Sequence, residues 1–120
     1  MTRPRHVVCE QQGGTLIVAP AASAANLADA EVAAEWSAAQ HRLDEKRIRN
    51  LVVDLSALPY FGSTILECLT QMWKVLKAKN GKLAIAGASR IGREVLAAAR
   101  LDKLWRTCDT RREALDWLDQ

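Results

Sequence analysis

The chain has 120 residues, the size of one ordinary domain, of which 49% are hydrophobic and 26% are charged. These proportions exclude an intrinsically disordered segment and predict a folded core. The net charge of +3 is small, and acidic residues interrupt the densest basic stretch, residues 41–49, so no basic face for nucleic acid is expected.

Two short strands are predicted first. The β-rich segments 5–10 and 15–20 flank Gly13-Gly14, which is typical of a hairpin, and Pro20 ends the second because it has no N–H for a sheet ladder. A helix over about Ser23 to Leu43 follows. Its apolar residues recur at steps of three and four, as on one face of an amphipathic helix; they are Ala28, Val32, Trp36, Ala39 and Leu43.

A continuous apolar segment, residues 50–55, predicts a strand that is covered on both faces. Asp54 interrupts this segment, and a carboxylate there is costly unless it is hydrogen-bonded or lies near the strand's open end. We interpret Asp54 first as a cap of the following turn, which contains Ser56 and Pro59, and second as a functional residue.

The helix that begins after Gly62 carries two neighbouring apolar stripes, so it should be deeply packed. One stripe is Leu66, Leu69, Trp73 and Leu76, and the other is Ile65, Cys68, Met72 and Val75. Asn80-Gly81 should end this helix, because both residues tolerate a left-handed backbone.

The remaining elements complete an alternation of strands and helices. A strand is predicted over residues 82–87, a helix from Ser89 to about Arg100 with Ile91, Val95 and Ala99 on one face, and an edge strand over residues 103–107. The last helix covers residues 110–118, where Thr110 and Glu113 have capping-box spacing. The fold class is therefore α/β: a single domain over residues 1–120, with its core at about 15–118. A mixed, mostly parallel sheet of four to five strands is packed by about four helices.

Two hydroxyls stand where the central strand gives way to the central helix. Thr64 and Glu67 have capping-box spacing, which predicts Thr64 as the N-cap and leaves Ser63 just outside the helix. A helix start favours an anion, and a phosphate on Ser63 would add a charge of roughly −1.5 to −2. Ser63 is therefore the candidate modification site, with Thr64 as the alternative. A helix start whose hydroxyls act only as caps is the competing interpretation.

Catalytic chemistry finds little support in the residue types. The two histidines, His6 and His41, do not follow predicted strands, so no general base is placed beside Ser63 or a cysteine. The segment 87–92, GASRIG, has the wrong spacing for a phosphate loop, although Ser89 could start a weak anion site. His6-x-x-Cys9 offers two metal ligands, fewer than zinc needs. We expect no enzyme, no metal and no cofactor.

Two features of the sequence indicate the cellular compartment: the three cysteines and the lack of a long apolar segment. Cys9, Cys68 and Cys108 are odd in number and widely spaced, which favours a reducing compartment over a disulfide framework. No stretch approaches the roughly 20 apolar residues of a membrane span. The expected location is the cytoplasm.

The segment 51–69, LVVDLSALPYFGSTILECL, resembles the central motif of STAS domains of the anti-sigma factor antagonist type. In that motif an apolar strand ends in Asp-Leu-Ser, and Asp-Ser-Ser/Thr-Gly-Leu opens a helix. Segments 76–89 and 95–115 resemble the later parts of the family, so the resemblance extends from about Thr15 to Leu118. Ser63 matches the motif serine, Leu66 the motif leucine, and Asp54 and Ser56 the strand-end pair.

The resemblance implies a regulator without catalytic activity. Typical members bind an anti-sigma factor that is also a serine kinase with a histidine-kinase-like ATP-binding fold; phosphorylation of the motif serine breaks the complex, and a phosphatase restores it. Carried over, the phosphorylated residue is Ser63. The resemblance also leaves room for a homodimer. The expected partner-binding residues are Asp54, Ser56, Tyr60, Phe61, Gly62, Ser63, Thr64, Glu67 and Ser89.

Two positions depart from the family pattern. Gly62 stands where the family has Asp, which removes a negative group beside the serine, and Ile65 stands where it has Gly, which we expect to narrow the space for a partner. Two other functions therefore stay open: a STAS-type accessory subunit of a transport ATPase in phospholipid trafficking, and an unphosphorylated scaffold of a signalling complex.

Overall fold

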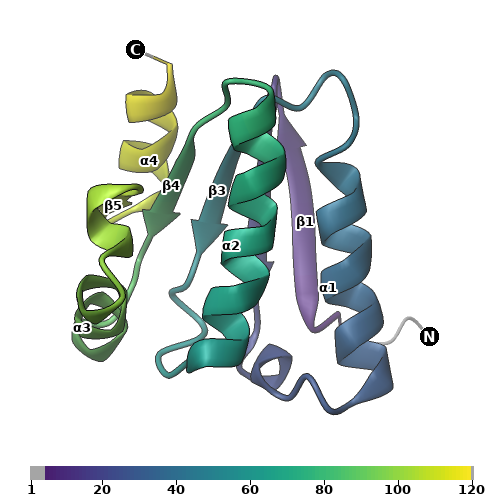
Figure 1. The fold of residues 1–120 in the computed structure, drawn as a ribbon, viewed down its shortest axis with the longest axis vertical. Coiled ribbons are helices and arrows are strands. Elements are labelled where there is room, and N and C mark those ends of the chain that lie inside the picture. Colours follow the sequence, from purple (N-terminus) through teal and green to yellow (C-terminus); the bar gives the residue numbers. More distant parts are fainter. Residues whose placement is uncertain (1–4, 120) are drawn as a thin grey trace.

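The computed structural model describes residues 5–119, which form one sheet with helices on both of its faces (Figure 1). The strands are β1 (Val7–Gln12), β2 (Thr15–Pro20), β3 (Asn50–Asp54), β4 (Leu83–Ala86) and β5 (Arg106–Cys108). The helices are α1 (Ala30–Arg42), α2 (Ser63–Ala78), α3 (Arg90–Ala98) and α4 (Arg111–Leu118), with short 3-10 turns η1 (Ala22–Ala25) and η2 (Leu101–Lys103).

The sheet has the strand order β1-β2-β3-β4-β5. β1 and β2 are antiparallel and form the predicted hairpin, with Val7 opposite Pro20. The other three pairs are parallel, and helices connect their strands. This arrangement confirms the predicted α/β fold with a mixed, mostly parallel sheet. It also brings the carboxyl ends of β2, β3 and β4 and the start of β1 to one edge of the sheet.

The buried strands divide their side chains between two cores, because successive residues of a strand point to opposite faces. The larger core lies under α1 and α2; from the strands it takes Leu16, Val18, Leu51, Val53, Leu83 and Ile85. The smaller core lies under α4; from the strands it takes Ile17, Val52, Ala84, Ala86 and Cys108. The three central strands are thus apolar on both faces, and for β3 this confirms the prediction from residues 50–55.

Side-chain caps fix the starts of three helices. The Asp29 carboxylate accepts hydrogen bonds from the Glu31 and Val32 amides at the start of α1, and Ser89 caps α3. Thr110 accepts from the Glu113 amide at 3.1 Å, which confirms the predicted cap of α4.

Asn80-Gly81 ends α2 as predicted, but the two residues act differently. Asn80 adopts the left-handed backbone with φ of 59°. Gly81 does not: its amide donates to the Leu76 carbonyl at 2.8 Å, and a Cβ there would lie 1.9 Å from the Arg49 carbonyl oxygen. Gly81 therefore serves close packing of backbone on backbone.

Three element predictions need correction. The first helix starts at Ala30, not Ser23, because Asp29 caps it and η1 precedes it, so Ala28 lies outside its apolar face. The last strand is Arg106–Cys108 and not residues 103–107. The predicted face of α3 is wrong at two of its three residues: Val95 packs against the larger core, but Ile91 is 45% exposed and Ala99 is exposed, whereas Gly92 and Leu96 are buried.

Among the helices of the described residues, none combines the length and the apolar character that crossing a membrane would require.

Candidate functional site

The loop between β3 and α2, residues 55–62, carries several of the predicted site residues, and its buried apolar side chains hold it in place. Leu55, Leu58 and Phe61 are buried, and they alternate with exposed residues that include Ser56 and Tyr60. The Leu55 amide donates to the Ala86 carbonyl of β4 at 2.8 Å. These apolar anchors hold the loop against the carboxyl edge of the sheet.

Asp54, the last residue of β3, connects this loop with α4. Its Oδ1 accepts from the Ser56 amide at 3.0 Å and from the Ser56 hydroxyl at 2.7 Å, so the predicted turn cap is confirmed. Its Oδ2 accepts from Nε and Nη2 of Arg111 at 3.1 and 3.0 Å. Arg111 also lies 3.5 Å from Glu10 of β1. The Asp54 carboxylate therefore positions the loop and joins it to α4, and Arg111 extends this contact to β1.

The same contacts set the protonation of Asp54. Burial by itself would raise the pKa of this carboxyl group, but the hydrogen bonds from Ser56 and the adjacent Arg111 guanidinium outweigh it and hold the pKa below its usual value of 3.8. The side chain of Asp54 is only 14% exposed. At neutral pH it is a fixed negative charge whose acceptor sites are already used inside the protein.

Ser89 and two glycines join the start of α3 to the same loop. The Ser89 hydroxyl donates to the Pro59 carbonyl at 2.7 Å and accepts from the Gly92 amide at 2.9 Å. A Cβ at Gly92 would lie 2.9 Å from the Phe61 ring, and Gly87, with φ of 68°, lies against Asp54 and Ser56. The glycines of the GASRIG segment thus serve packing against the loop.

Ser63 and Thr64 are both exposed in the first turn of α2. The predicted capping box is wrong: Gly62 is the N-cap, Ser63 and Thr64 are the first two helical residues, and no side chain within residues 5–119 caps this helix. Backbone geometry thus starts the helix two residues earlier than the spacing to Glu67 suggests, and the amides of its first turn have no acceptor within the helix. Glu67 is exposed one turn further along the helix.

The two positions that depart from the family pattern have different surroundings. Ile65 is 2% exposed and belongs to the larger core, so it does not narrow the space near the hydroxyls, contrary to expectation. Gly62 has φ of −118°, and a Cβ built there meets no atom within 4 Å. The backbone and the space at Gly62 would therefore accept the aspartate that other members carry.

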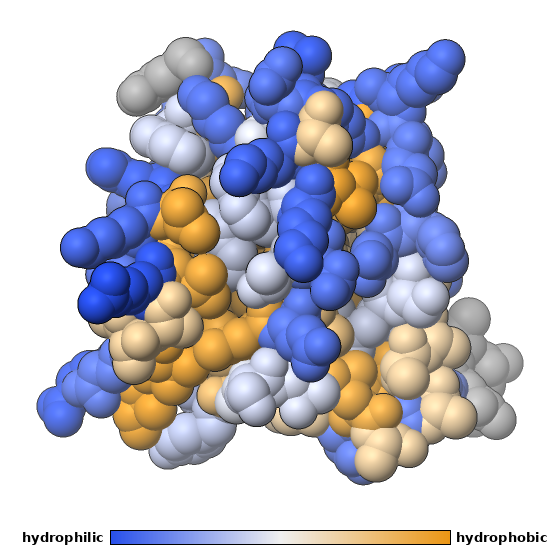
Figure 2. Space-filling model, in the orientation of Figure 1, coloured by the Kyte–Doolittle hydropathy of each residue, from blue (hydrophilic) through white to orange (hydrophobic). Residues whose placement is uncertain are grey.

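Three large apolar side chains of the loop, of α3 and of the segment after η2 are exposed. Figure 2 shows a band of apolar surface that runs from the α3–β5 segment toward the lower end of α2. Tyr60 in the loop is 67% exposed, Ile91 in the first turn of α3 is 45% exposed, and Leu104 after η2 is 57% exposed. Exposed apolar surface of this kind is typical of a protein interaction surface.

The predicted site residues are thus brought to one edge of the molecule, although in different roles. Tyr60, Gly62, Ser63, Thr64 and Glu67 are exposed. Asp54, Ser56 and Ser89 make hydrogen bonds within the site, and Phe61 is buried. Sequence reasoning missed Arg111, Gly87 and Gly92. Arg111 and Asp54 lie 57 positions apart in the sequence, so no local pattern predicts their contact.

The cysteines do not supply a nucleophile to this site. Burial raises the pKa of Cys9, Cys68 and Cys108, which disfavours the reactive thiolate at neutral pH.

Comparisons with known proteins give a family and a set of similar folds. The sequence matches the family described as STAS domain over residues 6–114. No curated protein gives a match. An anti-sigma-factor antagonist (STAS) domain protein of Planctomyces limnophilus superposes with a TM-score of 0.82 at 24% identity, covering 95% of this chain and 98% of that one.

Two structures of the anti-sigma factor antagonist SpoIIAA are also similar. Its unphosphorylated form gives a TM-score of 0.77 at 15% identity, covering 94% of this chain and 96% of that one. The phosphorylated form of the Bacillus protein gives 0.64 at 16% identity, covering 92% and 96%. At these identities the likeness is one of fold.

Proposed function

Because the chain belongs to the STAS domain family, we propose that it is an anti-sigma factor antagonist that phosphorylation at Ser63 switches off. In this proposal its partner is an anti-sigma factor with serine-kinase activity and a histidine-kinase-like ATP-binding fold. The protein acts by binding this partner and catalyses no reaction. A phosphatase returns Ser63 to its binding form.

The position of Ser63 carries the proposal. This residue is exposed at the first position of a 16-residue helix, next to a loop that buried residues hold in place. A kinase can reach its hydroxyl without unfolding the protein. The positive end of α2 would stabilise a phosphate there, so the fold tolerates the charge.

In this proposal the docking face consists of Ser63 together with the exposed apolar residues Tyr60, Ile91 and Leu104. Their exposures of 45% to 67% leave substantial apolar area for a partner to cover. A phosphate of charge roughly −1.5 to −2 beside them would have to be desolvated when the partner docks. Modification would therefore weaken the complex while leaving the fold intact.

The proposal is tested by incubating the protein with ATP and a candidate anti-sigma kinase from the same organism. Mass spectrometry should find one added phosphate, and peptide mapping should assign it to Ser63. Ser63→Ala should keep partner binding and lose the phosphate, whereas Ser63→Asp should weaken binding. Thr64→Ala is the matched control, because this neighbouring hydroxyl is equally exposed and should not be needed.

The other outcomes separate the alternatives. Phosphate on neither Ser63 nor Thr64, together with retained binding, would support an unphosphorylated scaffold. Gly62, which lacks the carboxylate of the family pattern, is the observation that favours this second function. Co-purification with the ATP-binding subunit of a transporter would support an accessory role in phospholipid trafficking and would refute the anti-sigma assignment.

A further inference from the structure

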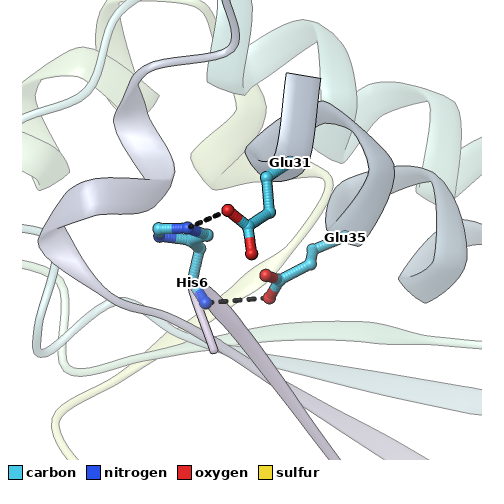
Figure 3. Close-up of side chains that lie close together, drawn as sticks. All are labelled: His6, Glu31 and Glu35. Atoms are coloured by element: carbon cyan, nitrogen blue, oxygen red, sulfur yellow. Dashed lines mark hydrogen bonds and ion pairs between the residues drawn. The ribbon is translucent and has the colours of Figure 1, made fainter. Parts of the chain in front are cut away.

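A histidine and two glutamates come together where the start of β1 meets the first turns of α1 (Figure 3). Glu31 and Glu35 are one helical turn apart, so both carboxylates project from the same face of α1 toward His6. One potential ligand atom from each residue lies within 4.8 Å of the others, and His6 Nε2 is 3.9 Å from Glu31 Oε2.

Hydrogen bonds to neighbouring groups orient Glu35 and His6. Glu35 Oε1 accepts hydrogen bonds from the backbone amides of His6 and Val7, both at 2.8 Å, which fixes the carboxylate against β1. The His6 carbonyl accepts from the Ala21 amide at 2.8 Å, and His6 Nδ1 lies 2.7 Å from the Ser23 hydroxyl. When Nδ1 carries the proton and donates to Ser23, Nε2 presents its lone pair toward the glutamates.

From this arrangement we propose that His6, Glu31 and Glu35 form a binding site for a divalent transition metal, with Zn²⁺ as the best fit. One imidazole nitrogen and two carboxylates are a ligand set that Zn²⁺ accepts, with a fourth position for water. Zinc–ligand bonds of about 2.0–2.2 Å require donor atoms roughly 3.3 Å apart in a tetrahedron. To bind the ion, the three donor atoms, which now lie within 4.8 Å of one another, would have to close to that value.

The sequence analysis expects no metal site, because it finds only the two-ligand fragment His6-x-x-Cys9. The spacing His6-x-x-Cys9 pairs the histidine with a thiol on the same strand, whereas the fold pairs it with carboxylates from the helix. The site lies at the edge of the sheet that also carries Asp54, but it shares no residue with the docking face. Zinc binding and phosphorylation are therefore independent claims. Bound zinc would join β1 to α1.

The test is calorimetric titration of the full chain with Zn²⁺, accompanied by thermal unfolding with and without the metal. One saturable site and a higher Tm with zinc are expected, because zinc binds the folded arrangement and not the unfolded chain. Mg²⁺ at the same concentration should produce neither effect, since it prefers all-oxygen octahedral sites. No saturation below ~1 mM zinc would overturn the proposal.

Variants assign the site to its residues. His6→Ala and Glu35→Gln should each weaken zinc binding by at least tenfold; Glu35→Gln keeps a carbonyl oxygen for the two backbone amides, so its fold should be retained. Ser23→Ala should weaken binding about 10-fold or more through the loss of the ring partner. His41→Ala is the control, because this exposed histidine at the other end of α1 should not matter.

A spectroscopic readout excludes thiol binding. Co²⁺ placed in the site should give visible absorption without a thiolate charge-transfer band, and Cys9→Ser should leave zinc affinity unchanged. Equal zinc affinity in His6→Ala and in the unmodified protein, or loss of binding in Cys9→Ser, would show that the three side chains form an ion-pair network only.

Discussion

Replacing Asp54 by Asn should destabilise the protein by about 2 kcal/mol at neutral pH. Asn keeps an oxygen for the Ser56 amide, but its amide nitrogen would face the Arg111 guanidinium, donor against donor. Exposed ion pairs contribute roughly 0.2–1 kcal/mol, and breaking a fully buried pair costs about 3–5 kcal/mol. With side chains 14% and 35% exposed, this pair lies between those limits. The corresponding decrease in Tm is roughly 6–10 °C.

The effect should depend on pH in a defined direction. The pKa of Asp54 is lower in the folded protein than its usual value of 3.8, so the unfolded chain binds the proton more tightly. The stabilisation from the carboxylate is therefore complete above about pH 5 and is lost as the pH falls through the folded-state pKa. Urea unfolding at a series of pH values between 7 and 3 measures the difference between the two proteins.

Two results would refute this reasoning. One is a stability difference between Asp54→Asn and the unmodified protein that stays constant from pH 7 to pH 3. The other is an equal loss in the control variant Glu10→Gln. Glu10 is exposed and meets Arg111 only at 3.5 Å, so its removal should cost less than about 0.5 kcal/mol.

Three further predictions concern the loop and the helix starts beside it. Gly92→Ala should lower the free energy of unfolding by about 1–3 kcal/mol, because its Cβ would lie 2.9 Å from the Phe61 ring; urea unfolding measures this, and an unchanged midpoint would contradict it. Ser89→Ala should cost about 1 kcal/mol by removing the α3 cap and the bond to Pro59, unlike Ser89→Thr. Gly62→Asp should stabilise the protein by a few tenths of a kcal/mol and should speed phosphorylation of Ser63 by a candidate anti-sigma kinase, which a radiolabel assay would measure.

Local patterns predicted the parts of the site whose partners lie close in sequence. Asp54 caps its own turn through Ser56, two positions on, and Thr110 caps α4 through the amide three positions on. The apolar residues of β3 also predicted a strand covered on both faces, since burial on each side leaves a continuous run. In the two capping cases the hydrogen-bond partner lies within three residues, so a short sequence pattern is enough to predict it.

The start of α2 and the packed face of α3 escaped prediction because packing overrode the local pattern. Thr64 had the spacing of a cap, but the buried Phe61 and Ile65 on either side fix where α2 begins, and that places Gly62 at the N-cap. In α3 the apolar periodicity pointed to Ile91, yet the face that packs is centred on Gly92, where the Phe61 ring occupies the space of a side chain. A glycine contributes nothing to a hydrophobic pattern, although it can lie at the closest contact.

The anchored loop between β3 and α2 also limits how far the structure could change if Ser63 were phosphorylated. Hydrogen bonds and buried residues tie this segment to β4, α3 and α4, so it has little freedom to rearrange. A phosphate at the first position of α2 would strengthen the helix, because it compensates the positive end of the macrodipole. The effect of phosphorylation would then be electrostatic and local. The phosphorylated and unphosphorylated forms would keep the same fold, and the partner would distinguish them by their charge at Ser63. Such a switch resets as fast as the phosphate is removed, without a refolding step.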